Sequence, residues 1–279
     1  MKLGIQAGSV NDGTLEGAIA YAKALEIPSI VLTAAAVPGY RETGLLDAKA
    51  LAAQVQSVKN AGLSTGTMQF WPPFSLADEA ATADTLSKLG KNMDAAAKAG
   101  IQVLAMFTGL AKPVNPADEP AQWEQIIAFY GEITALADKY GIKLASHFSG
   151  HTGRSLLAGA AGYRKLFAAV PSLNNGLTWC IGNVFVSDGE RLYDLMDEFA
   201  PRIHFVHMRS TKTSWGESPF WWDIKDGPDI RRVLEKLKAI GYEGTLSHEH
   251  MPEHIPGENR QDITAAWANG YMRALLRYL

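Results

Sequence analysis

Short runs rich in apolar and β-branched residues alternate along the chain with longer amphipathic, alanine-rich runs. The short runs predict strands, and the longer runs, with apolar residues three to four apart, predict helices. The predicted strands are Leu3–Gln6, Ser29–Thr33, Ser64–Gln69, Gln102–Phe107, Lys143–His147, Leu177–Cys180, Ile203–Arg209 and Thr245–Glu249. The predicted helices are Thr14–Leu25, Asp47–Ala61, Asp78–Ala99, Pro120–Tyr140, Gly162–Ala169, Gly189–Phe199, Asp229–Ile240 and Asp262–Tyr278.

Glycines mark several of the predicted helix ends, namely Gly62, Gly100, Gly141 and Gly241. Glycine tolerates the left-handed conformation that terminates a helix. Eight strand–helix units predict a parallel sheet, and eight strands close a barrel. We therefore expect an α/β fold, a (β/α)8 TIM barrel. An open, doubly wound sheet is the alternative, but no glycine-rich phosphate loop follows any predicted strand.

The length and composition limit the number of domains, the possible partners and the cellular location. The 279 residues suit one barrel of roughly 250 residues, and no linker divides them, so we expect a single domain over residues 1–279. The net charge of −3 provides no basic surface for a nucleic acid. No apolar run approaches the roughly 20 residues that span a bilayer, and the amino terminus resembles a strand rather than a signal peptide. With one cysteine, Cys180, no disulfide can form within the chain, and we expect a cytoplasmic protein.

Polar side chains gather where the last four predicted strands end. The first four ends carry Gln6, Thr33, Gln69 with Trp71, and Thr108, whereas the last four carry residues 146–151, 179–183, 207–211 and 247–250. In a β/α barrel the loops after the strands build the active site. The sequence therefore predicts the chemistry at these last four ends.

Strand alternation predicts which side chains point into the barrel. The predicted inward sets are Lys143, Ala145 and His147; Thr178 and Cys180; Ile203, Phe205, His207 and Arg209; and Thr245, Ser247 and Glu249. If these faces point inward, His147, Cys180, His207 and Glu249 converge. Imidazole, thiolate and carboxylate are the usual donors for a catalytic divalent ion. These four residues are the predicted metal ligands.

Simpler readings exist for each of these residues. A single buried histidine is more often a hydrogen-bonded core residue than a ligand, and a single cysteine is more often an apolar filler. His204 and His248 have the opposite parity, so we expect structural roles for them. Arg209 could bind a carboxylate or phosphate of the substrate, or form a salt bridge across the barrel mouth.

Aromatic clusters follow the third and seventh predicted strands, in residues 71–74 and 220–222. They could pack against the barrel rim or line a sugar pocket, because amphipathic rings suit the apolar faces of polyols. The sequence alone leaves both readings open.

The segments at residues 176–183, 202–211 and 247–250 resemble the xylose-isomerase-like barrel superfamily and, within it, the mannonate dehydratase family. Residues 270–276, Glu217-Ser218 and the Asp-Gly-Pro-Asp-Ile run at 226–230 add to the resemblance, which is clearest from about residue 140 onward.

The resemblance implies a manganese or similar ion held by His147, Cys180, His207 and Glu249, with Glu249 where the family has Asp. It also implies that His250 lies at the substrate. Among the departures from the family, Phe148–His151 replaces a Pro-Asp-Asp segment, and an aromatic near Trp221 or Trp222 replaces a histidine. These departures affect the acid/base groups more than the metal ligands.

The leading interpretation is a metal-dependent lyase, a dehydratase acting on a sugar acid or polyol. The predicted cofactor is a divalent ion, Mn²⁺ first, with Mg²⁺, Co²⁺ or Zn²⁺ as alternatives. The predicted catalytic residues are His250, His151 and Arg209, and the predicted substrate contacts are Trp71, Trp222 and Asn183.

Three other functions stay open at this stage. They are a sugar isomerase or epimerase working through a metal-stabilised enediolate, a lyase on an oxidised glycoside, and a non-catalytic sugar-binding barrel. The apolar carboxy-terminal helix would also allow a homodimer.

Overall fold

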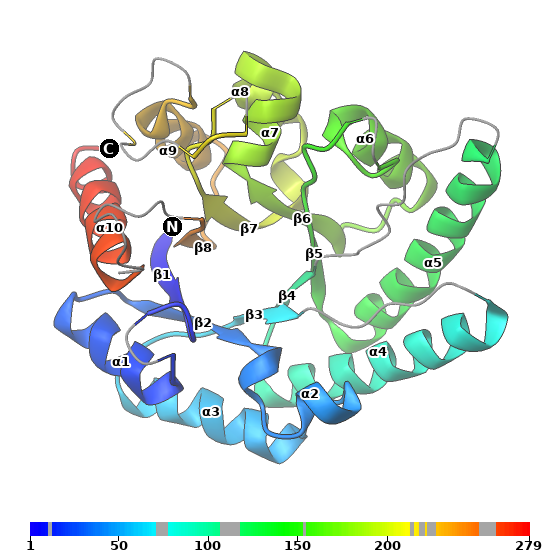
Figure 1. The fold of residues 1–279 in the computed structure, drawn as a ribbon, viewed down its shortest axis with the longest axis horizontal. Coiled ribbons are helices and arrows are strands. Elements are labelled where there is room, and N and C mark those ends of the chain that lie inside the picture. Colours follow the sequence, from blue (N-terminus) through cyan, green and yellow to red (C-terminus); the bar gives the residue numbers. More distant parts are fainter. Residues whose placement is uncertain are drawn as a thin grey trace.

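Eight parallel strands form a closed barrel in the order β1 to β8, with β8 paired to β1. The computed structural model describes residues 1–10, 13–70, 78–106, 118–152, 155–212, 215–217, 221, 227–250 and 261–279. The strands lie at the centre and the helices surround them (Figure 1). The predicted (β/α)8 barrel is confirmed.

The strand bounds differ from the predicted ones by a few residues at most. The strands are β1 Lys2–Gln6, β2 Ser29–Thr33, β3 Thr67–Phe70, β4 Val103–Met106, β5 Lys143–His147, β6 Asn175–Cys180, β7 Ile203–Met208 and β8 Thr245–His248. All neighbouring pairs are parallel. Their carboxyl ends therefore meet at one end of the barrel, where the predicted site lies.

The helices are α1 Leu15–Ala24, α2 Tyr40–Thr43, α3 Ala48–Asn60, α4 Glu79–Ala99, α5 Glu119–Tyr140, α6 Gly159–Ala169, α7 Ile181–Asp188, α8 Leu192–Glu198, α9 Ile230–Ala239 and α10 Gln261–Arg277. The described residues also form the 3₁₀ turns η1 Ala34–Ala36, η2 Gly189–Arg191 and η3 Ala200–Arg202. The side chains of Asp47, Asp78 and Asp229 accept backbone N–H groups at the starts of α3, α4 and α9, which stabilises these helix ends. All four predicted terminating glycines have positive φ angles, from 65° to 85°.

Helix α7 is the main element that the sequence pattern did not predict. It begins at Ile181, directly after the last residue of β6, and it buries Ile181, Val184 and Phe185. The spacing of these three residues is helical, but the run is too short to be separated from the preceding strand by pattern alone. As a consequence, Cys180, the predicted last residue of the strand, lies at a strand–helix junction.

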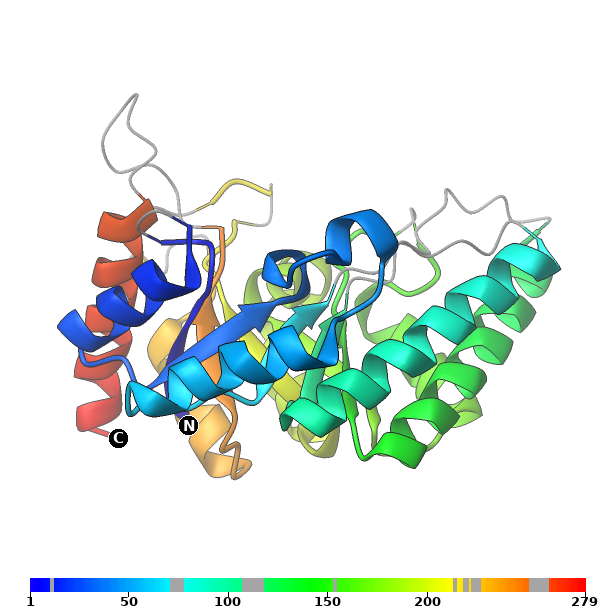
Figure 2. The same cartoon turned by 90° about the horizontal axis from the view of Figure 1, so that it is seen from below.

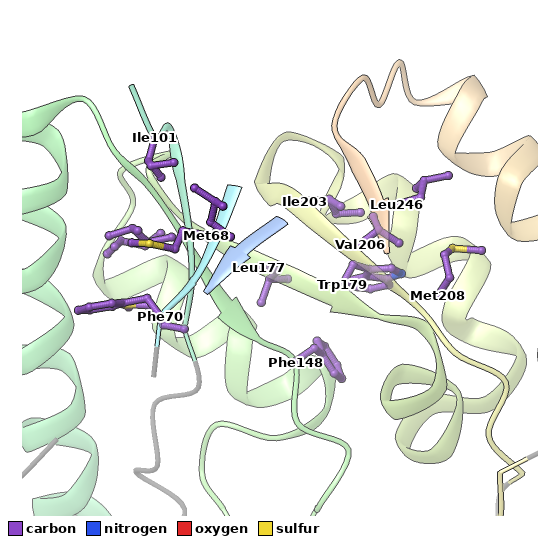
Figure 3. Packing of buried hydrophobic residues seen from close by; sticks show 14 of the residues in the cluster. Met68, Phe70, Ile101, Phe148, Leu177, Trp179, Ile203, Val206, Met208 and Leu246 are labelled. Carbon is purple, nitrogen blue, oxygen red and sulfur yellow. The ribbon is translucent and has the colours of Figure 1, made fainter. Parts of the chain in front are cut away.

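The buried apolar residues of the described part of the chain form two clusters. Val31, Ala105, Ala145 and Phe205 form a small cluster inside the barrel, and the large cluster lies between the strands and the helices. Figure 3 shows part of the large cluster, including Leu177 and Trp179 of β6 and Val206 of β7. The predicted alternation is thus confirmed for Ala145 and Phe205.

The prediction that Ile203 shares the inward face of Phe205 is wrong. Ile203 belongs to the large cluster outside the barrel. The pairing of β6 with β7 steps from Leu177–Ile203 to Thr178–Phe205, so β7 carries one extra residue, His204, at a bulge. An extra residue shifts the alternation on one side of it, while the parity from Phe205 to His207 is unaffected.

The last helix closes the ring against the first. Helix α10 lies beside α1 in both views (Figures 1 and 2). The Tyr21 hydroxyl donates to the backbone carbonyl of Asp262, and the Arg273 guanidinium donates to the carbonyls of Leu25 and Glu26. Within the described part of the chain, none of the helices combines the length and apolar character needed to cross a membrane.

Candidate metal centre

The four predicted ligands come from four consecutive strands. His147 ends β5 and Cys180 ends β6, His207 lies one residue before the end of β7, and Glu249 directly follows β8. The backbone N–H of Glu249 donates to the carbonyl of Met208 at 3.0 Å, which continues the β7–β8 pairing by one residue. We call His147, Cys180, His207 and Glu249 the candidate metal centre.

The donor atoms of these residues face one another. His147, Cys180 and Glu249 each offer one atom, and these three atoms lie within 4.8 Å of one another. His207 is not in that compact group, but its Nδ1 lies 2.9 Å from Glu249 Oε1 and 3.1 Å from His147 Nε2. His147 Nε2 lies 3.3 Å from the same Glu249 oxygen, and the Cys180 thiol donates to Glu249 Oε2 at 3.3 Å.

Electrostatics keep Glu249 ionised although it is buried. Burial by itself would raise the pKa of this carboxyl, but the adjacent His207 and His147 outweigh burial and hold the pKa well below its usual range. Burial, followed by the charge of Glu249, raises the pKa of the Cys180 thiol well above its usual range. Burial also lowers the pKa of His207. A neutral thiol thus lies beside an ionised carboxylate, and a cation at the centre would favour the thiolate.

The spacing of the donors fits a divalent ion. With metal–ligand bonds of about 2.1 Å, neighbouring ligand atoms are about 3.0 Å apart in an octahedron and about 3.4 Å apart in a tetrahedron. The contacts of 2.9, 3.1 and 3.3 Å among His147, His207 and Glu249 fall in this range or at its edge. Two nitrogens, one sulfur and one carboxylate are also a donor set that transition metals accept. The residues present therefore fit a metal ion.

Arg209 is engaged by other protein groups. Its Nε donates to Glu217 Oε1 at 2.8 Å, its Nη2 donates to the same oxygen, and its Nη1 donates to Asn183 Oδ1 at 3.0 Å. Nη1 also lies 4.0 Å from Glu249 Oε2. The guanidinium thus joins Glu217, Asn183 and the candidate metal centre, an arrangement close to the predicted salt bridge across the mouth.

Asn183 is buried and has partners for both ends of its amide. Its Oδ1 accepts from Arg209, and its Nδ2 donates to the carbonyl of Phe148 at 2.9 Å. Its side chain is about 6% exposed as part of α7. A substrate contact of Asn183 stays a prediction, and the described contacts tie the loop after β5 to the start of α7.

Both predicted catalytic histidines lie at the rim. His250 has a φ angle of 48°, and its Nε2 lies 3.9 Å from Glu249 Oε1 while its side chain is 61% exposed. His151 is exposed and stacks on Trp215, with ring centroids 4.1 Å apart and planes 9° from parallel. The structure therefore brings His250 next to the candidate metal centre and joins His151 to a second aromatic ring.

The two predicted aromatic substrate contacts, Trp71 and Trp222, lie outside the described residues. Trp221, the neighbour of Trp222, is buried and packs edge-on against Trp267 of α10. Rim packing therefore accounts for this one residue of the aromatic cluster at 220–222.

Three further residues near the site were not singled out from the sequence. Glu217 pairs with Arg209, Trp215 stacks on His151, and the Gln69 amide lies 3.5 Å from the His207 ring. The sequence carries a signal for two of them, since Gln69 is a polar residue at the end of a predicted strand and Glu217 lies in a segment that resembles the family. No sequence signal marked Trp215.

The two histidines of opposite parity face away from the centre. His204 Nε2–H donates to the carbonyl of Leu173 at 2.8 Å, and His248 Nδ1 lies 3.4 Å from the Asn269 amide. Burial is the main cause that lowers the pKa of each to about 4. Both are therefore neutral at pH 7, and the structural role expected for them stays a prediction.

A larger hollow lies at the opposite end of the barrel. It has a volume of about 640 Å³ and is lined by residues including Lys2, Gln102, Lys143 and Glu243. Size does not decide the active site here, because β/α barrels carry their chemistry at the carboxyl ends of the strands. The candidate metal centre lies at that end.

Comparison with known proteins gives a family and a shared fold. The sequence profile of the family described as "Xylose isomerase-like TIM barrel" matches residues 19–271. A mannonate dehydratase of Oceanobacillus iheyensis is 30% identical over 143 residues, which are 48% of this chain and 40% of that protein. A mannonate dehydratase of Bacillus subtilis is 27% identical over 164 residues, which are 56% of this chain and 45% of that protein. The matches thus span less than half the length of these two curated relatives.

Solved structures match over nearly the whole chain. The mannonate dehydratase of Streptococcus suis serotype 2 has a TM-score of 0.74 and 19% identity, covering 100% of this chain and 94% of that one. An L-ribulose 3-epimerase also has a TM-score of 0.74, with 17% identity, covering 99% of this chain and 95% of that one. At these identities the likeness shows the fold alone.

Proposed function

The chain belongs to the xylose isomerase-like TIM-barrel family, and we propose that within it the protein is a metal-dependent dehydratase acting on a sugar acid. The observation that carries this proposal is the convergence of nitrogen, sulfur and oxygen donors from four consecutive strands at the carboxyl end of the barrel. The partial likeness to mannonate dehydratases supports a sugar acid as the substrate class and dehydration as the reaction.

In this proposal His147, Cys180, His207 and Glu249 hold one divalent cation. Mn²⁺ is the first candidate because the resemblance implies it, and Mg²⁺, Co²⁺ and Zn²⁺ are the alternatives. When bound, the cation would act as a Lewis acid on a carboxylate or hydroxyl oxygen of the substrate.

His250 is the proposed acid/base residue. Dehydration requires one group to take the proton beside the carboxylate and another to protonate the departing hydroxyl. Imidazole suits both tasks because it titrates near neutral pH. The backbone of His250 is left-handed, and its Nε2 lies 3.9 Å from Glu249 Oε1. Most of the ring is still exposed and can reach a substrate. His151 is the proposed partner, and its stacking on Trp215 restrains the ring.

The carboxylate-binding role of Arg209 carries a structural condition. Two of its nitrogens already donate to Glu217, so a substrate carboxylate would have to compete with Glu217 for the guanidinium. Without that exchange, Arg209 supports the site by holding Asn183 and by placing positive charge near Glu249.

A sugar epimerase is the second candidate function. The solved L-ribulose 3-epimerase matches this fold as well as the solved mannonate dehydratase does. A metal centre that acidifies a C–H bond would serve an epimerase through an enediolate as readily as a dehydratase.

The test is a panel of sugar acids, keto sugars and oxidised glycosides incubated with the protein and Mn²⁺, with products identified by mass spectrometry. A dehydratase converts a sugar acid to a 2-keto-3-deoxy acid with loss of one water, whereas an epimerase conserves the mass. His207→Ala should lose both metal and activity, and the matched variant His250→Ala should lose activity while it still binds metal. If the wild-type chain binds none of the four ions, the proposal is wrong.

A further inference from the structure

We propose that Gln69 is a positioning residue for the candidate metal centre. Its side-chain amide can donate to or accept from Nε2 of the His207 ring, and so allows Nε2 to carry the proton when Nδ1 binds an ion. This inference rests on the metal site of the proposed function.

Gln69 reaches the centre from the far side of the barrel. It lies in β3, where it pairs with Thr33 of β2 and Ala105 of β4. Its neighbours Met68 and Phe70 belong to the cluster outside the barrel. Gln69 itself is about 8% exposed, and its Nε2 lies 3.5 Å from His207 Nε2 although the residues are 138 positions apart.

The two ring nitrogens of His207 have separate partners. Nδ1 faces Glu249 and His147, whereas Nε2 faces the Gln69 amide. His207 is about 1% exposed, so each nitrogen depends on a protein partner. In a neutral imidazole one nitrogen donates and the other accepts, and the group at one nitrogen decides the state of the other.

Without an ion, the contacts fit one tautomer. Nδ1–H donates to the ionised Glu249 at 2.9 Å, and Nε2 then carries the lone pair that faces the NH₂ group of Gln69. The 3.5 Å separation of these nitrogens makes this a weak contact.

With an ion on Nδ1, the proton has to move to Nε2, and this buried N–H requires an acceptor. The Gln69 amide can supply one by rotating half a turn, which exchanges its NH₂ group for the carbonyl oxygen without changing its shape. Glutamine can therefore hydrogen-bond Nε2 in both tautomers of His207. A carboxylate at this position could chiefly accept from Nε2–H, as in the metal-bound tautomer, and an apolar side chain could bond neither.

Among the described residues, the space bounded by residues including Gln69, Ala105, His147 and His207 is too small for a water molecule to take the place of the amide. The Thr178 hydroxyl, which also lines this space, donates to the carbonyl of Ala145. The Gln69 amide is thus the group placed to satisfy Nε2–H among the residues that border this space.

The experiment measures ion affinity for matched variants. Gln69→Met keeps the length of the side chain and removes its hydrogen bonding, Gln69→Glu retains an acceptor, and Gln102→Met makes the same change at an exposed position near the opposite end of the barrel. Metal-free protein is titrated with Co²⁺ against a competing chelator, and thermal unfolding of each metal-free variant reports on packing.

Partners of ligating histidines typically contribute 10- to 100-fold to metal affinity. We expect Gln69→Met to weaken Co²⁺ binding about 10- to 100-fold, and Gln69→Glu and Gln102→Met to bind at least as well as wild type. In histidine-labelled protein loaded with Zn²⁺, ¹⁵N spectra should show His207 protonated at Nε2 in wild type.

Two outcomes overturn this inference alone: wild type and Gln69→Met bind Co²⁺ equally, or Gln69→Glu is as weak as Gln69→Met. A Zn²⁺-loaded wild type with the proton of His207 on Nδ1 also overturns it. A wild-type chain that binds no ion overturns the metal site and this inference with it.

Discussion

His204 should make the stability of the barrel depend on pH. The ring is buried at the bulge of β7, and its Nε2–H donates to the carbonyl of Leu173. Burial, with the nearby Lys143 and Arg202, lowers the pKa of His204 to about 4, from 6.5 for an ordinary histidine. The unfolded chain therefore binds a proton at this residue before the folded chain does.

The sign follows from proton linkage. Above about pH 6.5 the ring is neutral in both states, so its contribution to stability is fully present. As the pH falls from about 6.5 towards 4, the unfolded state gains a proton and the contribution is lost. The pKa difference corresponds to about 3 kcal/mol in total, of which about 2 kcal/mol is lost by pH 5.

The assay is urea unfolding of wild type and His204→Gln between pH 7.5 and pH 5, followed by fluorescence and circular dichroism. Glutamine keeps an N–H donor for Leu173 but does not titrate. The free energy of unfolding of wild type, minus that of the variant, should fall by about 2 kcal/mol over this range.

The matched control is Leu173→Ala, which trims an exposed side chain and leaves the accepting carbonyl in place. It should keep the wild-type pH dependence. A difference between wild type and His204→Gln that stays constant with pH would refute the reasoning, because it would mean that His204 titrates alike in both states.

Three further predictions concern single positions. Gly176→Ala should destabilise the protein by about 1–3 kcal/mol in urea unfolding, because the new Cβ would lie 2.3 Å from His204 ring atoms and 2.5 Å from the Arg202 carbonyl; an unchanged midpoint contradicts this. Cys180→Ser should weaken Co²⁺ binding at least about tenfold, since a direct ligand should matter as much as the partner of a ligand; equal affinity would exclude sulfur as a ligand. Trp215→Ala should raise the KM for the substrate about two- to tenfold through lost stacking with His151 and leave Co²⁺ affinity unchanged; a loss of metal binding instead would show a structural role.

The order of the strands and helices could be read from the pattern because each element carries its own periodicity and its own end signals. Asp47 and Asp78 cap the starts of α3 and α4, as expected, and Gly100 and Gly141 end α4 and α5. The bulge at His204 could not be read this way. It depends on how β7 pairs with β6, and the strand's own residues do not reveal its partner's register.

The donor set of the candidate metal centre followed from two local rules, that strand ends meet at one end of a barrel and that side chains alternate. These rules placed His207 apart from His204 and Glu249 apart from His248. They could not predict which partner each side-chain atom contacts. Arg209 was expected either to bind the substrate or to form a salt bridge across the barrel mouth, and in the fold it binds Glu217, eight residues later in the chain.

The sequence by itself determined the barrel and the four strand ends that carry imidazole, thiol and carboxylate groups, because both depend on residues close together in the chain. The tertiary structure alone decided that Gln69 meets His207, since only closure of the barrel brings β3 and β7 to face each other across its interior. It also decided that Glu249 stays ionised, because the histidines that lower its pKa come from β5 and β7. Contacts and charges of this kind depend on distances across the closed barrel, which no local pattern contains.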